Sequence, residues 1–172
     1  VDGLVTNTPG VVLTTFYADC VPLYFVDPVH KAIGLSHSGW RGTVNDIAAA
    51  TVKRMKELYG TDPADICAAI GPSICQDCYE VSEDVILQFQ QHYPAKLWPK
   101  LFYERRTSNP PERKFQLNLW EACRQNMLRA GILPEHIEMT DICTCCNPDV
   151  LFSHRASHGR RGNLAAFLSI RG

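Results

Sequence analysis

Two short polar segments near the N-terminus each follow a run of apolar and β-branched residues. The first contains Asp19 and Cys20, and the second, SHSGWRG, runs from Ser36 to Gly42 and includes His37. Runs of this kind predict buried strands, so the thiol of Cys20 and the imidazole of His37 are expected at the ends of adjacent strands. Such a pair binds a metal ion or forms a nucleophile–base dyad, and both options stay open at this point.

Length and charge restrict the class of protein. The 172 residues are 45% hydrophobic, which suits one substantial core, and we expect one domain over residues 1–172. The formal net charge is −1 without a sustained basic run, which argues against nucleic acid as a partner. No apolar stretch has the length of a membrane span, and the N-terminal run is unlike a signal peptide. We therefore expect a cytoplasmic protein with small-molecule ligands and no membrane partner. The oligomeric state stays open.

The apolar patterns predict an α/β fold in which layered β-sheets are flanked by helices. After the N-terminal strands, the pattern changes to helical spacing, and we expect one helix from Thr43 to Tyr59 with Thr43 as its N-cap. A polar, Pro-rich stretch from Pro94 to Lys114 is expected to be a loop. Further helices are expected at 83–92 and 117–130, and further strand segments at 66–70, 137–139, 141–143 and 164–170.

The turn at residues 37–43 is the strongest local candidate for a ligand site. Three small residues let backbone N–H groups approach a ligand closely, namely Ser38, Gly39 and Gly42. The helix that begins at Thr43 adds positive potential, and Arg41 adds a bidentate donor. This combination suits phosphate or another compact oxyanion, so Ser38, Gly39, Gly42 and Thr43 are candidate substrate-binding residues. An ordinary tight turn with a solvated Arg41 explains the same residues equally well.

Four ordered motifs resemble the multicopper-oxidase-like "laccase domain" family. They are TFYADCVP at 15–22, SHSGWRGT at 36–43, IGPSI at 70–74 with CYEV at 78–81, and FSHR at 152–155. The resemblance spans nearly the whole chain and implies an α/β fold. Members are described as polyphenol oxidases and as purine nucleoside phosphorylases with adenosine deaminase and methylthioadenosine phosphorylase activities. The resemblance therefore implies an enzyme whose partners are purine nucleosides and phosphate.

The resemblance also implies a zinc site made of two His and one Cys. Cys20 and His37 match two of these ligands. The other His belongs to a Gln-Val-His signature that this sequence does not contain, so we expect the chain to be N-terminally incomplete. Three protein ligands and one open position are typical of catalytic zinc, whereas two ligands hold the metal weakly. His154 and His158 are weaker substitutes for the third ligand.

The implied mechanism gives roles to three further residues. Arg41 would hold the phosphate that attacks the ribose anomeric carbon, whereas deamination would use a zinc-bound water. Asp19 is a candidate catalytic group that orients a ligand or exchanges protons, and it is alternatively a strand-end cap. Arg155 is a candidate substrate-binding residue. Ala156 and Ser157 replace a second Arg and an Asp of the family ending, which weakens that assignment.

A group of five cysteines is a rival metal site. Cys75 and Cys78 have the spacing of a zinc-binding pair. We interpret the crowded group Cys143, Cys145 and Cys146 as lacking the usual two-residue gap. Reduced, buried thiols are therefore favoured over a closed structural zinc site.

Three other functions remain for the same residues. A metal-free hydrolase or deamidase would use Cys20 as nucleophile and His37 as base. A copper-dependent polyphenol oxidase needs several His-rich sites, and the six scattered histidines contain no His-X-His pattern, so zinc is favoured over copper. A non-catalytic interaction domain is the third alternative, should the metal site be incomplete.

Overall fold

The computed structural model describes residues 2–105, 113–160 and 162–171. The strands are β1 (Gly3–Thr6), β2 (Val12–Tyr17), β3 (Val21–Asp27), β4 (Ala32–Ser38), β5 (Cys67–Ile70), β6 (Glu80–Ser82), β7 (Phe102–Arg105), β8 (Lys114–Leu117), β9 (Ile137–Met139) and β10 (Leu164–Ser169). The helices are α1 (Trp40–Val44), α2 (Ile47–Tyr59), α3 (Glu83–His92), α4 (Trp98–Leu101) and α5 (Leu119–Arg129), with 3-10 turns η1 (Pro63–Asp65), η2 (Gln76–Cys78), η3 (Ala95–Leu97) and η4 (Pro134–His136).

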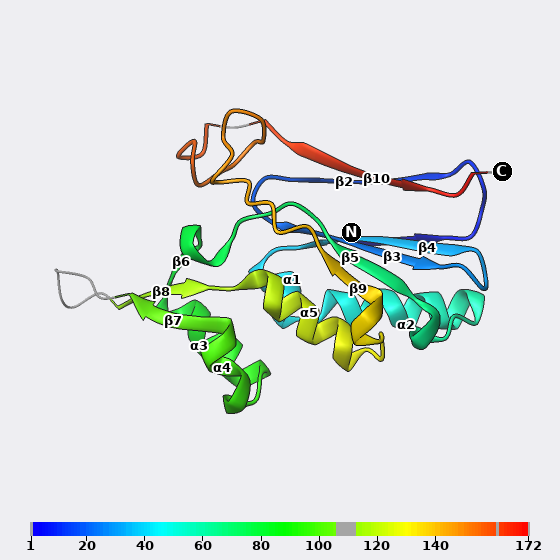
Figure 1. Ribbon diagram of the computed structural model, residues 1–172, viewed down its shortest axis with the longest axis horizontal. Coiled ribbons are helices and arrows are strands. Elements are labelled where there is room, and N and C mark those ends of the chain that lie inside the picture. Colours follow the sequence, from blue (N-terminus) through cyan, green and yellow to red (C-terminus); the bar gives the residue numbers. More distant parts are fainter. Residues whose placement is uncertain (1, 106–112, 161, 172) are drawn as a thin grey trace.

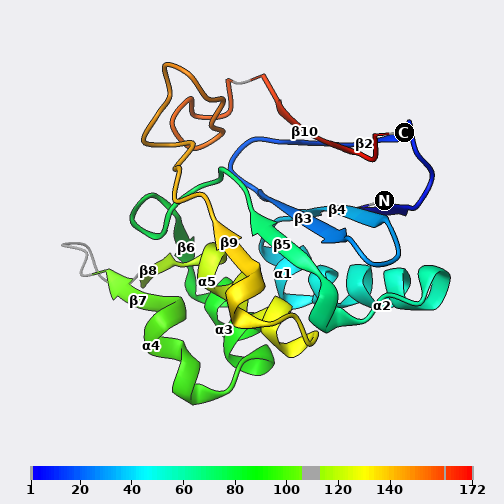
Figure 2. The same cartoon turned by 45° about the vertical axis from the view of Figure 1, so that its right-hand side comes forward.

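A five-stranded sheet in the order β1–β4–β3–β5–β9 forms the middle layer (Figure 1). Helices α2 and α5 lie on one side of it, and a two-stranded sheet of β2 and β10 lies on the other (Figures 1 and 2). A separate three-stranded sheet, β6–β8–β7, stands beside α3 and α4. These layers confirm the expected α/β fold of sheets flanked by helices. No helix in the described part of the chain is long and apolar enough to cross a bilayer.

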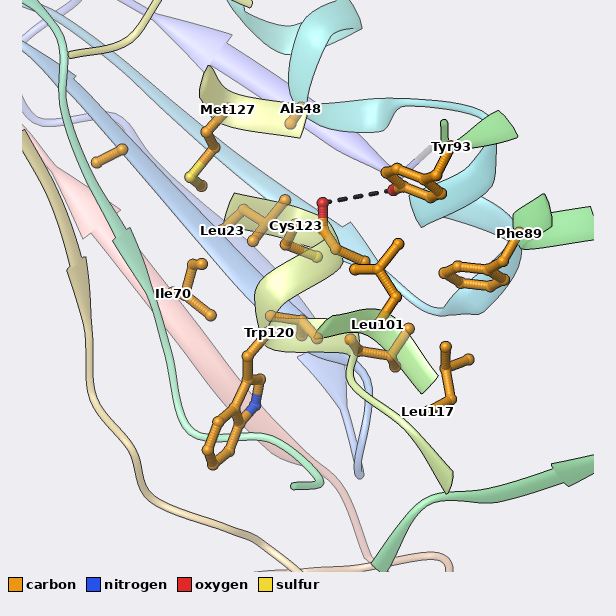
Figure 3. Close-up of a cluster of buried hydrophobic side chains, with 14 of the residues drawn as sticks. Leu23, Ala48, Ile70, Phe89, Tyr93, Leu101, Leu117, Trp120, Cys123 and Met127 are labelled. Carbon is orange, nitrogen blue, oxygen red and sulfur yellow. Dashed lines mark hydrogen bonds between the residues drawn. The ribbon is translucent and has the colours of Figure 1, made fainter. Parts of the chain in front are cut away.

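The central sheet separates two cores. On the helix side, Leu23 and Ile70 of the sheet belong to one buried cluster with Met127 of α5 and Phe89 of α3 (Figure 3). On the other side, a smaller core joins the sheet to β2 and β10, and it consists of Leu13, Tyr17, Ile33, Leu35 and Ala166. Removal of these apolar surfaces from water is the main stabilisation of the three-layer arrangement.

The pairing of β3 with β4 determines which side chains face each core. The strands are antiparallel, with Val21 opposite Ser38 and Pro22 opposite His37. Because successive side chains alternate between faces, Ser38 points to the helix side and His37 points to the β2 side. Cys20 precedes Pro22 by two residues and lies on the same side as His37.

The helix expected from Thr43 to Tyr59 is divided in two. Helix α1 already begins at Trp40, so Thr43 is an interior residue and not the N-cap. The chain then turns at Asp46, which has a left-handed backbone with φ 56° and accepts a hydrogen bond from the Ala49 N–H. Aspartate is among the residues that tolerate this conformation and that cap helices well, so α2 starts afresh after it.

The segment expected to be a loop from Pro94 to Lys114 contains regular structure. It holds η3, α4 and β7, and it ends at the start of β8, while residues 106–112 lie outside the described part. Strands β7 and β8 pair in antiparallel fashion, and the rings of Phe102 and Phe115 pack edge to face at 6.4 Å. These aromatic residues give the hairpin an apolar face, which the polar, Pro-rich composition of the segment does not indicate.

The remaining elements agree with the expected pattern to within a few residues. Helix α5 starts after Asn118, whose side chain accepts a hydrogen bond from the Glu121 N–H, and α3 spans the expected residues. The strand segment expected at 137–139 is confirmed as β9, whereas residues 141–143 do not form a strand. Cys143 instead forms an isolated parallel bridge with Ser73.

Candidate functional site

The thiol of Cys20 lies at the start of β3, beside the end of β4 that carries His37. The β3–β4 pairing ends with Val21 opposite Ser38, and Cys20 and Gly39 are the residues next to that last pair. A Cβ atom added at Gly39 would lie 3.1 Å from the Cys20 Sγ, so the glycine gives the thiol its space. Cys20 is half-buried and packs against the smaller core. The two predicted metal ligands therefore share one face and one end of the central sheet.

A backbone carbonyl orients the imidazole of His37. Its Nδ1 atom lies 2.9 Å from the Phe16 oxygen on β2. A carbonyl oxygen only accepts, so in the neutral imidazole Nδ1 carries the proton and Nε2 keeps its lone pair. Metal-binding histidines are commonly held by a hydrogen bond of this kind. Thiolate and neutral imidazole thus fit two positions of the expected zinc site.

The polar residues of the 37–43 turn do not all face this thiol. Ser38 and Thr43 are fully buried on the helix side, where their hydroxyls lie 2.9 Å apart and Thr43 donates to the Gly39 oxygen, also at 2.9 Å. The Cys123 Sγ on α5 completes the group at 3.7 Å from the Ser38 hydroxyl. The side chains of these residues hold the turn against α5. Gly39 and Gly42 remain the turn positions without a side chain.

Arg41 presents its guanidinium at the exposed side of the same turn. The guanidinium carbon lies 4.3 Å from the centre of the Trp40 ring, a stacking distance that limits the motion of the long side chain. An exposed, pre-oriented guanidinium is suited to a phosphate or carboxylate. The Arg41 guanidinium is thus exposed beside the turn, and anion binding by it stays a prediction.

Asp19 is a junction between distant segments. It is buried and its backbone has φ 80°. One carboxylate oxygen accepts a hydrogen bond of 2.7 Å from the Thr144 hydroxyl, and the other accepts one of 2.7 Å from the Arg155 backbone N–H. Its main-chain oxygen accepts from the Ile74 N–H at 3.0 Å. Each carboxylate oxygen is thus engaged within the protein, which gives Asp19 a positioning role.

The side chain of Arg155 is directed at the backbone near β6. Its guanidinium donates to the Glu80 oxygen at 2.8 Å and to the Cys78 oxygen at 3.4 Å, and it lies 5.5 Å from the centre of the Tyr79 ring. The next two residues form a turn in which the Ala156 N–H and the Ser157 hydroxyl bind Ser153. Arg155 therefore holds residues 143–160, the closing segment (orange in Figure 2), over the end of the sheet.

Tyr79 is a site residue that the sequence arguments did not single out. Burial, and then the charge of an ionised Cys20 thiol, raise the pKa of the Tyr79 hydroxyl to about 12, against the opposing effect of the Arg155 guanidinium. The charge of Asp19 also raises this pKa, whereas the Arg41 guanidinium lowers it. Tyr79 thus stands among the candidate residues from three segments. Its position in the CYEV motif is the sequence feature that indicates it as a site residue.

The weaker candidates for the third metal ligand lie in the 153–160 turns. His154 and His158 are both exposed, and His158 has a left-handed backbone with φ 49°. Within residues 2–105, 113–160 and 162–171, convergence of three or more potential metal-binding side chains is limited to Cys75, Cys78, Cys143 and Cys146. Cys143 and Cys146 are separated by two residues, so the interpretation that this group lacks the two-residue gap is wrong.

Known proteins match the chain over nearly its full length. The model of the family described as "Multi-copper polyphenol oxidoreductase laccase" matches residues 1–171. The chain is 39% identical over 99% of its length to the purine nucleoside phosphorylase YlmD of Geobacillus stearothermophilus, and it covers 60% of that protein. It is 37% identical over 90% of its length to the adenosine deaminase RL5 of an unknown prokaryotic organism, covering 56% of that protein.

A solved structure agrees with these relationships. The crystal structure of YlmD from Geobacillus stearothermophilus matches 100% of this chain with a TM-score of 0.89 at 38% identity, and the match covers 62% of that chain. The chain thus spans about three fifths of the length of these three proteins.

Proposed function

Because the chain belongs to the multi-copper polyphenol oxidoreductase laccase family, we propose that it acts on purine nucleosides. The proposed reactions are phosphorolysis of purine nucleosides, including methylthioadenosine, and deamination of adenosine. Relatives named purine nucleoside phosphorylase and adenosine deaminase support this substrate class. The whole protein's activity is part of the proposal, since the chain covers three fifths of those relatives.

The observation that carries the proposal is the shared position of Cys20 and His37. Both lie at one end of the central sheet and on one face, and the His37 imidazole is held with Nε2 available. We propose that these two side chains hold a catalytic zinc ion together with a third ligand. Zinc bound there supplies a Lewis acid and lowers the pKa of a bound water.

The surrounding residues have separate tasks in this proposal. Arg41 binds the phosphate and orients it toward the ribose anomeric carbon, while Gly39 leaves room beside the Cys20 thiol and Gly42 packs against the turn itself. The hydroxyls of Ser38 and Thr43 hold the turn in place from the helix side. Asp19 is a positioning residue.

Two more residues complete the proposed site. Arg155 fixes the closing segment and shapes the substrate-binding side. Tyr79 keeps its proton throughout the neutral range, since its pKa is raised to about 12, and it can therefore donate a hydrogen bond to substrate. This makes Tyr79 a substrate-orienting residue in the proposal.

A Cys–His hydrolase is the second candidate. The availability of His37 Nε2 favours it as well, because that atom can accept a proton from a nucleophilic thiol. Copper oxidase chemistry has less support in the described residues. Their convergent ligand group consists of cysteines, whereas the histidines His30 and His92 are paired with Asp27 and Arg129.

The phosphate assignment is tested by comparing two reactions of the full-length protein. Arg41→Ala should raise the KM for phosphate in phosphorolysis by about tenfold or more, because a charged hydrogen bond contributes about 1.5–3 kcal/mol. Adenosine deamination needs no phosphate and should change much less. Arg54→Ala is the matched control, since Arg54 is an exposed residue of α2 that pairs with Glu57. Equal losses in both reactions, with unchanged phosphate dependence, would contradict the role of Arg41.

A further inference from the structure

Four cysteine side chains meet at a second place in the fold, between η2 and the loop that follows β9. The Sγ atoms of Cys75, Cys78, Cys143 and Cys146 all lie within 4.8 Å of one another. The Sγ atoms of Cys78 and Cys146 are 3.4 Å apart, well beyond the disulfide bond length of about 2.05 Å. A tetrahedral zinc ion with Zn–S bonds of about 2.3 Å places its thiolates about 3.8 Å apart. The cluster therefore has the dimensions of a four-thiolate zinc site.

The spacing along the chain agrees with this geometry. Cys75 and Cys78 are separated by two residues, and so are Cys143 and Cys146. Two such pairs from two loops are the usual composition of a closed structural zinc site. Cys145 lies between the second pair but packs half-buried against the main core and is not part of the converging group.

The backbone holds both loops together independently of the thiols. Ser73 and Cys143 form a parallel bridge, in which the Ser73 N–H donates to the Ile142 oxygen and the Thr144 N–H donates to the Ser73 oxygen. The N–H groups of Cys75 and Cys146 point at the Cys143 Sγ, at 3.2 Å and 3.4 Å. Such donors stabilise a thiolate. The ligand positions are thus preorganised for a cation.

We propose that Cys75, Cys78, Cys143 and Cys146 bind one structural zinc ion as thiolates. The four thiols lose their protons on binding, and no oxidation step is involved. Because all four coordination positions are filled by protein, this ion takes no substrate. The inference concerns a site separate from Cys20 and His37, and it stands whether or not the proposed purine nucleoside activity is correct.

The position of the cluster gives the zinc ion a defined task. Cys78 is followed directly by Tyr79, and Thr144 lies between the ligands of the second pair and donates to Asp19. The Cys78 oxygen also accepts from the Arg155 guanidinium. Zinc binding here joins the two loops that deliver Tyr79 and Thr144 to the candidate site. The ion thereby stabilises the wall of that site without entering it.

Metal analysis of full-length protein, purified under reducing conditions, tests the proposal. The variants Cys78→Ser and Cys146→Ser should each lose about one equivalent of zinc per chain and have a lower Tm. Cys145→Ser is the matched control and should retain the zinc. A Cys20→Ala variant should also retain this ion, which separates failure of the second site from failure of the catalytic site.

Two measurements on the wild-type protein keep the test decisive when a variant does not fold. Cobalt-loaded protein should show thiolate-to-cobalt charge-transfer bands and the d–d bands of a tetrahedral ion. Alkylation mapped by mass spectrometry should modify Cys67 readily, and the four ligand cysteines only after chelation. Iron in place of zinc, disulfides within the cluster, or rapid alkylation of all four thiols in metal-replete protein would overturn the proposal.

Discussion

The carboxylate of Asp19 accepts a hydrogen bond of 2.7 Å from the backbone N–H of Arg155, a residue 136 positions further along the chain. This contact joins the strand end that carries Cys20 to the C-terminal closing segment. Thr144 donates to the other carboxylate oxygen, so one side chain secures two positions of that segment. The arrangement of the candidate site depends on Asp19 even though its oxygens are engaged within the protein.

Asp19→Ala should therefore destabilise the protein strongly. The change removes two charge-assisted hydrogen bonds and leaves the Thr144 hydroxyl and the Arg155 N–H without this acceptor, at a cost of about 2–4 kcal/mol. Asp19→Asn retains tolerance of the left-handed backbone and one good acceptor, so it should lose less. Urea unfolding of the two variants measures the difference. A loss below about 0.5 kcal/mol for Asp19→Ala would contradict the anchoring role.

Gly39→Ala should affect the Cys20 thiol specifically. The backbone of Gly39, with φ −78° and ψ 179°, suits any residue, but the new Cβ would lie 3.1 Å from the Cys20 Sγ. Overpacking of this kind costs about 1–3 kcal/mol. In a Cys20→Ala background the cost should largely disappear, because the thiol is gone. A double-mutant cycle on unfolding free energies measures this coupling, and strict additivity would show that the contact has no energetic effect.

Thr43→Val distinguishes a structural from a ligand-binding hydroxyl. The substitution keeps the shape but removes the donor to the Gly39 oxygen and the partner of the buried Ser38 hydroxyl, which should cost about 1–3 kcal/mol of stability. Thr43→Ser keeps the hydroxyl and should lose less. The variants are compared by urea unfolding and by the KM for phosphate. Unchanged stability with a raised KM would instead favour direct substrate binding, as the sequence predicts.

Alkaline unfolding tests the environment of Tyr79. In the unfolded chain a tyrosine loses its proton near pH 10, whereas in the folded protein the pKa of Tyr79 is raised to about 12. The stability that follows from this shift is complete below pH 10 and is lost as the pH rises from 10 to 12, because the unfolded chain releases the proton first. Tyr79→Phe should make the fall in stability between pH 10 and 12 less steep. An unchanged slope would show that the hydroxyl is solvated.

Local sequence patterns contain much of the fold. Strand alternation determines the faces of β3 and β4, and a cap residue such as Asn118 marks the start of α5 because its side chain satisfies a helix N–H. The division between α1 and α2 at Asp46 also depends on a tertiary contact. The Asp46 carboxylate also accepts from Arg129, which follows it by 83 residues, and no local pattern contains that contact.

The candidate site divides in the same way. The positions of Cys20 and His37 at neighbouring strand ends follow from the two apolar runs, and the opposite orientations of His37 and Ser38 follow from alternation. The hydrogen bond from the Arg155 guanidinium to the Glu80 oxygen does not follow from local patterns, because the closing segment reaches β6 only in the folded chain. Convergence of the cysteine pairs likewise depends on the bridge between Ser73 and Cys143.

The most direct test of the proposed function is to assay phosphate-dependent cleavage of a purine nucleoside by the full-length protein before and after exhaustive chelation. Intact-mass analysis in the presence of substrate accompanies the assay, together with the Cys20→Ser variant. The proposal predicts that chelation abolishes activity, that added zinc restores it, and that no adduct forms, while Cys20→Ser loses zinc affinity and activity together. Full activity without metal, together with a substrate-dependent adduct at Cys20, would contradict the zinc site and establish Cys20 as a nucleophile.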